Sequence, residues 1–181
     1  MTFADIPQLI NSGSWECNYR LATLEATIAD YVSQGLDLDP DFQRGHVWSL
    51  AQQQAYVEYF LQGGASGMVI YFNYPSWQGT NKTAYNDFVI VDGLQRLTAL
   101  RRFVRGEIRA FGQFVHEFGD SIDRSRRAHA LKFNVNCLQS RAEVLTWYLQ
   151  MNSGGTPHAS SEIERVRGLL DAEQSPRLLG A

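Results

Sequence analysis

The segment Phe88-Val-Ile-Val-Asp-Gly-Leu-Gln-Arg-Leu-Thr-Ala-Leu100 decides how this chain folds. Its apolar start predicts a buried strand, Asp92-Gly93 predicts a tight turn, and the spaced leucines that follow predict a helix. Glycine lets a backbone approach a ligand closely, and the first amides of a helix can hold phosphate. Gln95 and Arg96 fall off the leucine face, so both can project towards such an anion. The alternative is an ordinary strand-to-helix turn with a surface arginine.

Further helices and strands follow from the apolar pattern on both sides of this segment. Ser49 with Gln52, and Ser140 with Glu143, have the spacing of capping boxes, which open helices. We expect helices at 23–34, 49–62, 94–104, 140–151 and 161–170, and strands at 36–39, 68–72, 88–91 and 131–135. This mixture predicts an α/β (α+β) fold. We expect an N-terminal extension at 1–22, one domain at 23–171 and a flexible tail at 172–181.

The composition excludes several classes of protein. The 181 residues include ten Phe, eight Tyr and four Trp, which excludes an intrinsically disordered chain. No apolar run approaches the roughly 18–20 residues of a membrane helix, and the first residues do not have the pattern of a secretory signal. Cys17 and Cys137 have neither CxxC spacing nor a metal-type histidine pattern beside them. We therefore expect reduced thiols and a cytoplasmic protein with no membrane partner.

A second glutamine–arginine pair stands in the segment Pro40-Asp-Phe-Gln-Arg-Gly-His-Val-Trp-Ser49, between an expected strand and an expected helix. One interpretation is a loop whose Phe42 and Trp48 fill the core, with Gln43 and Arg44 in solvent. The other is that Gln43-Arg44 and Gln95-Arg96 converge on one ligand. An arginine on each side of a polyphosphate suits phosphoryl transfer, in which positioning and electrostatics do most of the work.

A third polar segment, Met151-Asn-Ser-Gly-Gly-Thr-Pro-His158, joins two expected helices. Asn152, Ser153 and Thr156 offer hydrogen bonds to a base, a ribose or a phosphate, and the glycines permit close approach. The alternative is a flexible connection between helices.

The net charge of −3 hides an uneven distribution. Residues 94–132 hold nine basic and four acidic side chains, whereas the rest of the chain holds seven basic and fifteen acidic ones. The local balances of +5 and −8 indicate either a solvated arginine-rich face or a surface that faces an anion such as DNA. The DNA-contacting candidates are Arg101, Arg102, Arg105, Arg124, Arg126 and Arg127.

Several familiar motifs are absent from the sequence. There is no GxxxxGK[ST] loop and no GxGxxG after a strand, and Gly63-Gly64-x-x-Gly67 precedes a strand rather than a helix. The four histidines have no metal-ligand spacing and no HNH-like pattern, which argues against a nuclease.

Taken together, PDFQRGHVW (40–48), VDGLQRLTAL (91–100) and MNSGGTPHASSEIERVR (151–167) resemble a known family. The chain is similar, over about residues 20–170, to the N-terminal domain of GmrSD-type modification-dependent restriction proteins, a branch of the ParB/sulfiredoxin superfold. The resemblance implies a small mixed sheet with surrounding helices and a bound nucleoside triphosphate. It assigns the nucleotide to Gln43, Arg44, Asp92, Gly93, Gln95 and Arg96. Other branches include CTP-hydrolysing partition proteins, sulfiredoxin and a kinase of free serine, which implies phosphoryl chemistry.

The chain departs from the family pattern in three ways. Leu94 replaces the first glutamine of the DGQQR motif, which removes one polar contact, and His158 stands where an aliphatic residue is usual. The sequence also ends where restriction enzymes of this type continue into an HNH-like nuclease domain, so we expect no DNA cleavage by that route.

These features lead to one main hypothesis and one alternative. The main hypothesis is a phosphoryl-transfer enzyme, either an NTPase or a DNA kinase, which uses Mg²⁺ and ATP, GTP, CTP or UTP and acts on DNA. Asp92 would be the base or the magnesium ligand, while Arg96 and Arg44 would stabilise phosphate charge. The nucleotide-binding candidates are Gln43, Arg44, Gly93, Gln95, Arg96, Thr98, Asn152, Ser153 and Thr156. The alternative is a non-catalytic sensor of modified DNA, or a regulatory partner of a separate nuclease or modification enzyme.

Overall fold

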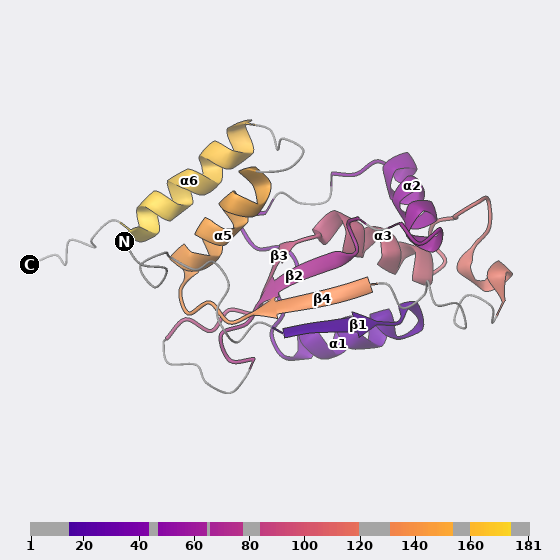
Figure 1. The fold of residues 1–181 in the computed structure, drawn as a ribbon, viewed down its shortest axis with the longest axis horizontal. Coiled ribbons are helices and arrows are strands. Elements are labelled where there is room, and N and C mark those ends of the chain that lie inside the picture. Colours follow the sequence, from indigo (N-terminus) through magenta and orange to yellow (C-terminus); the bar gives the residue numbers. More distant parts are fainter. Residues whose placement is uncertain are drawn as a thin grey trace, which may run out of the picture.

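A four-stranded mixed sheet forms the centre of the protein (Figure 1). The computed structural model describes residues 15–43, 47–64, 66–77, 84–119, 131–153 and 160–174. The strands are β1 (Trp15–Tyr19), β2 (Val69–Asn73), β3 (Val89–Asp92) and β4 (Leu131–Asn136), in the spatial order β1-β4-β2-β3. Strand β4 pairs antiparallel with β1 and parallel with β2, and β2 pairs antiparallel with β3. This arrangement confirms the predicted small mixed sheet.

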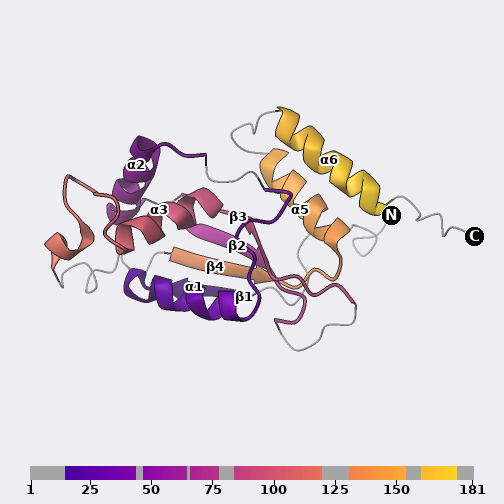
Figure 2. The same ribbon diagram turned by 180° about the vertical axis from the view of Figure 1, so that it is seen from behind.

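Helices cover one face of the sheet and, on the other face, the end at β3. The helical elements are η2 (Leu21–Thr23), α1 (Leu24–Ser33), α2 (Leu50–Leu61), α3 (Leu94–Val104), η3 (Val115–Phe118), α5 (Arg141–Ser153) and α6 (Ser160–Gln174). Helices α1, α2 and α3 pack with one face of the strands around a core that contains Phe60, Phe72 and Phe133. Helices α5 and α6 enclose a second, smaller core with Val89 and Val91 of β3. Figure 2 shows α1 in front of β1 on the first of these faces. The fold class is therefore α+β, as predicted.

The alternation of side chains along β3 explains why this strand is almost wholly apolar. Ile90 belongs to the first core, whereas Val89 and Val91 belong to the second, so both faces of the strand are covered. Each fully buried side chain of this size contributes roughly 1.5–3 kcal/mol through loss of water contact. The strand thus fixes the position of the turn that follows it.

The predicted strand at 36–39 is wrong. Asp37 forms a single parallel bridge with Val89, donating its amide to the Phe88 carbonyl (2.8 Å) and accepting from the Ile90 amide (3.1 Å). The chain then turns away, because the Asp39 amide donates to the Asp37 carboxylate at 2.8 Å instead of to a strand. The segment still runs beside β3, which is important for the site.

Both ends of the predicted domain extend further than the sequence indicated. Strand β1 lies within the segment expected to be an N-terminal extension, and it pairs with β4 along its whole length. Helix α6 continues to Gln174, past the expected boundary at residue 171. The sheet and the second helical layer therefore include residues on both sides of 23–171.

Candidate functional site

The turn between β3 and α3 requires glycine at position 93. Gly93 has a φ of +98°, and a Cβ placed there would stand 2.7 Å from the Cδ1 and 3.3 Å from the Cα of the fully buried Ile70. Gly93 also gives α3 no side-chain cap, and the first turn of the helix carries no acidic residue. No acidic side chain in the first turn of α3 therefore offsets the positive end of the helix dipole.

Arg96 folds back over this turn. Helical side chains point towards the N-terminus of their helix, and Arg96 accordingly forms an ion pair with Asp92, the last residue of β3. Its Nη2 lies 3.4 Å from the position of a Cβ on Gly93, and its Nη1 lies 3.7 Å from that of a Cβ on Gly67. Side-chain exposure is 18% for Arg96 and 32% for Asp92. The guanidinium is thus partly buried between two glycines, with one carboxylate partner.

Gln95 connects this turn to the loop that contains the other glutamine–arginine pair. Its Oε1 accepts from the amide of Val47 at 3.0 Å and from that of Trp48 at 3.2 Å. The carbonyl of Trp48 in turn accepts from the side chain of Gln53, which is buried in α2. The two segments therefore contact each other at residues 47–48 and 95, whereas the convergence of Gln43-Arg44 and Gln95-Arg96 on one ligand stays a prediction. We call Asp92, Gly93, Gln95 and Arg96, together with Val47 and Trp48, the Gly93 corner.

The other residues of the segment 40–49 attach this loop to β3 and to the two cores. The Gln43 side chain donates to the Ile90 carbonyl at 2.8 Å, so it holds the loop against the edge of β3. Phe42 is 2% exposed in the second core, and Trp48 packs against Tyr56, as the core interpretation of this loop predicted. Arg44 lies outside the described residues.

Tyr56 supports the corner from α2 and was not identified from the sequence. Its hydroxyl donates to the Gly67 carbonyl at 2.8 Å, next to the Arg96 side chain. Burial raises the pKa of Tyr56 to about 12, although the nearby Arg96 charge opposes the rise. Tyr56 is therefore a neutral hydrogen-bond donor near pH 7 rather than a base. The only sequence signal was Gly67 itself, in a glycine-containing run before β2.

The third predicted segment, residues 151–158, lies partly outside the described residues. The side chain of Asn152 is 8% exposed, and it donates to the Tyr148 carbonyl one turn earlier in α5 at 2.7 Å. Thr98 is partly buried in the second turn of α3. Thr156 and the side chain of Ser153 lie outside the described residues. The roles of these residues in nucleotide binding stay predictions.

Three arginines expected to contact DNA form ion pairs within the chain. Arg101 and Arg105 both contact the carboxylate of Glu25 in α1, at 2.7 and 2.6 Å. Arg102 contacts Glu107 at 3.0 Å and donates to Gln53 at 2.7 Å. These contacts attach α3 to its neighbours and offset much of its charge. Arg124, Arg126 and Arg127 lie outside the described residues.

The described residues do not form a preorganised magnesium site. Among them there is no group of three or more His, Cys, Asp or Glu side chains that could hold a metal ion. Asp92, the predicted ligand, faces the guanidinium of Arg96 instead. Magnesium that accompanies a nucleotide takes most of its oxygen ligands from phosphate and water and only one or two from carboxylates, so the role of Asp92 as a ligand stays a prediction.

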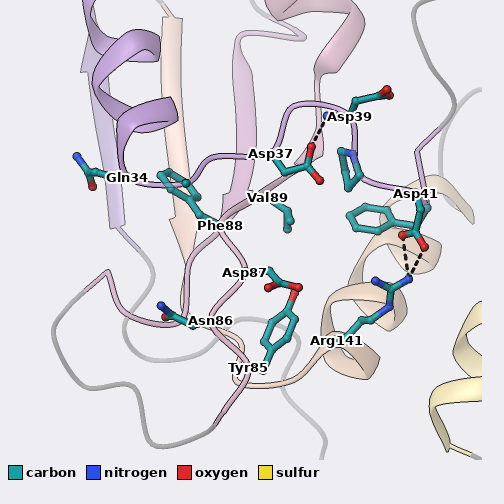
Figure 3. Close-up of a pocket in the computed structure, with 13 residues that line it drawn as sticks. Gln34, Asp37, Asp39, Asp41, Tyr85, Asn86, Asp87, Phe88, Val89 and Arg141 are labelled. Atoms are coloured by element: carbon teal, nitrogen blue, oxygen red, sulfur yellow. Dashed lines mark hydrogen bonds and ion pairs between the residues drawn. The ribbon is translucent and has the colours of Figure 1, made fainter.

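An acidic pocket lies at the opposite end of β3 from the Gly93 corner (Figure 3). Its volume is about 520 Å³, and Phe42, Phe88 and Tyr85 contribute aromatic walls. Asp41 is paired with Arg141, at 2.7 and 2.8 Å. The charged lining residues are Asp37, Asp39, Asp41, Asp87 and Arg141. Four carboxylates against one guanidinium repel phosphate, so a triphosphate does not suit this pocket. The alternating aspartates at 37, 39 and 41 were the sequence signal for it.

The described part of the chain contains no helix long and apolar enough to cross a membrane. A search of curated proteins and a search of solved structures found no match. A family model described as "GmrSD restriction endonuclease, N-terminal domain" matches residues 27–139, which is more than half of the chain and includes the whole Gly93 corner. The protein therefore belongs to the family of GmrSD restriction endonuclease N-terminal domains.

Proposed function

We propose that the Gly93 corner binds the phosphates of a nucleoside triphosphate. Membership of the family indicates a role in a modification-dependent restriction system that acts on DNA. The observation that supports the nucleotide proposal is the position of Arg96, whose guanidinium lies over Gly93 at the start of α3. A planar guanidinium and the first amides of a helix are the two groups that most often hold phosphate oxygens in proteins.

The partner of Arg96 suggests how the corner would exchange one anion for another. Asp92 neutralises Arg96 and holds it over the turn. A guanidinium has five N–H donors, so a phosphate oxygen could share Arg96 with Asp92 or replace it. Because Asp92 and phosphate carry the same sign of charge, removing the Asp92 charge should strengthen phosphate binding.

The loop at residues 47–48 would respond to a nucleotide through Gln95. Both backbone amides of this loop donate to the Gln95 side chain, which is next to Arg96 in the first turn of α3. Arg44 precedes this loop by three residues in the sequence. We propose that Arg44 supplies the second positive charge on the triphosphate.

Turnover is a second proposal, separate from binding. The γ-phosphoryl group would pass to water in an NTPase, or to a hydroxyl of a modified DNA base in a kinase. The pairing of Asp92 with Arg96 favours binding without turnover, because it engages the carboxylate that would act as base or magnesium ligand. On that account the domain senses nucleotide and regulates a separate nuclease or modification enzyme.

Binding of ATP, GTP, CTP and UTP to the wild-type protein and to Arg96→Ala tests the main proposal. Loss of a charged hydrogen bond to phosphate should lower the affinity for the preferred nucleotide by roughly ten- to a hundredfold. Arg20→Ala is the matched control, because it removes the same charge at the end of β1, on the far edge of the sheet from β3. Failure of all four nucleotides to bind, or equal affinity in Arg96→Ala, would contradict the proposal.

The same protein samples separate the two forms of turnover. We would incubate the protein with γ-labelled nucleotide and with either unmodified or 5-hydroxymethylated DNA. Label in free phosphate indicates an NTPase, and label in the modified DNA indicates a kinase. Nucleotide binding without either product supports the regulatory role.

A further inference from the structure

A two-residue hairpin turn follows α3 and has an aromatic residue at its tip. Ala110 and Gln113 exchange both backbone hydrogen bonds, each at 2.9 Å, around Phe111 and Gly112. These two central residues have φ values of +50° and +77°. Positive φ at both positions defines a turn that strongly prefers Asn-Gly or Asp-Gly. Phe111 is the sole residue other than glycine with a positive φ in the described ranges.

The Phe111 side chain is only half-buried. Ile108 and Ala110 are buried in the first core, and they alternate with Arg109 and Phe111, which face outwards. Phe111 is 51% exposed. A Cβ on Gly112 would meet no atom within 4 Å, so the tip projects into open space. About half of the Phe111 surface therefore stays in contact with solvent.

Contacts on both sides hold the turn in place. The Phe111 amide donates to the carboxylate of Glu58 in α2 at 2.7 Å. The Arg109 guanidinium donates to the Gly112 carbonyl at 3.2 Å and lies over the Phe114 ring, 4.3 Å from its centre. The segment after α3 (salmon in Figure 1) forms the end of the molecule opposite to α6. The strained aromatic tip is thus a fixed and projecting feature.

We propose that Phe111 is a DNA-contacting residue whose ring stacks on a nucleobase. The proposal rests on the DNA-directed role of the family and is independent of nucleotide binding at the Gly93 corner. Backbone strain that the surrounding structure maintains is typical of binding sites. Phenylalanine is one of the apolar residues that DNA-binding proteins insert between base steps.

The position of Arg109 supports DNA as the occupant. Arg109 is exposed on the same outward face as Phe111, where it can reach a phosphate beside a stacked base. Two carboxylates beside the turn, those of Glu58 and Glu117, accept hydrogen bonds from the Phe111 and Phe114 amides. An aromatic ring with adjacent arginine is the combination that nucleic acid binds, since the ring contacts the base while the charge attracts the backbone.

Affinity measurements on duplex DNA with 2-aminopurine at one position, and on the corresponding single strand, test this proposal. Phe111→Asn suits the turn but removes the ring, whereas Phe111→Trp keeps an aromatic surface. Phe111→Asn should lose roughly ten- to a hundredfold in affinity, and Phe111→Trp should stay within about threefold of the wild type. Val32→Asn is the control, because it removes an apolar side chain of 49% exposure from α1.

The spectroscopic and salt responses identify the mode of contact. A rise in 2-aminopurine fluorescence with the wild type, absent with Phe111→Asn, shows that the ring disturbs base stacking in the duplex. Arg109→Ala should lower the slope of log affinity against log salt by about one, while Phe111→Asn should leave the slope unchanged. Wild-type affinity in Phe111→Asn would overturn the proposal, and so would a wild-type protein that binds neither form of DNA. Neither result affects the Arg96 test with free nucleotide.

Discussion

Substitution of Gly93 by alanine tests the structural basis of the corner. Two costs add at this position. A left-handed backbone costs an L-residue roughly 1–2 kcal/mol, and Gly93 has a φ of +98°. The new Cβ would also stand 2.7 Å from Ile70 Cδ1 and 3.3 Å from the Ile70 backbone, and Ile70 is fully buried and has little room to move. Overpacking of this kind costs about 1–3 kcal/mol.

The expected loss is therefore about 2–4 kcal/mol in the free energy of unfolding, after a small offset from the stiffer unfolded chain. Urea unfolding followed by tryptophan fluorescence measures it, because the chain has four tryptophans. Gly106→Ala is the matched control. Gly106 has a φ of +71°, but a Cβ there would meet no atom within 4 Å, so only the backbone cost of about 1 kcal/mol applies. Equal losses in the two variants would refute the predicted clash with Ile70.

Three further substitutions test contacts that hold the fold together. Gln95→Ala should cost about 1–2 kcal/mol in urea unfolding, because the amides of Val47 and Trp48 lose their acceptor. Tyr31→Phe should cost about 1 kcal/mol by loss of the 2.8 Å hydrogen bond with Tyr19, and unchanged stability would contradict that bond. Burial acts to raise the pKa of the Glu25 carboxyl, but its two arginine partners outweigh burial and place that pKa below the ordinary value of 4.5. The stability that comes from this depressed pKa is present above about pH 4.5 and is lost as the pH falls through the folded-state pKa. The free energy of unfolding of Glu25→Gln should therefore change less between pH 7 and pH 3 than that of the wild type.

Local signals in the sequence predicted most of the helices. The capping box at Ser49 is present. The backbone amide of Gln52 donates to the Ser49 hydroxyl, and the side-chain Oε1 of Gln52 accepts from the Ser49 backbone amide at 2.9 Å. The leucine pattern after Gly93 predicted the buried face of α3, on which Leu97 and Leu100 are 1% and 0% exposed. The tight turn at Asp92-Gly93 was also predicted, whereas the contact with Ile70 that excludes a Cβ there was not. These features depend on residues within a few positions of one another.

Features that depend on distant partners could not be predicted. Strand β1 has only polar neighbours on one of its faces, where Glu16 pairs with Lys132, so no apolar run marked it. The partners of Arg101 and Arg105 are 76 and 80 residues away in sequence, so these arginines resembled an uncompensated basic face. The strain at Phe111 arises from the turn geometry, which the sequence Phe-Gly does not ordinarily indicate.

The central claim is that phosphate competes with Asp92 for Arg96. Calorimetric titration of the preferred nucleoside triphosphate into Asp92→Asn and Arg96→Ala tests this claim most directly. The claim predicts opposite changes: tighter binding in Asp92→Asn, because a like charge is removed, and binding weaker by ten- to a hundredfold in Arg96→Ala. Affinities that change in the same direction, or that do not change in either variant, would contradict it.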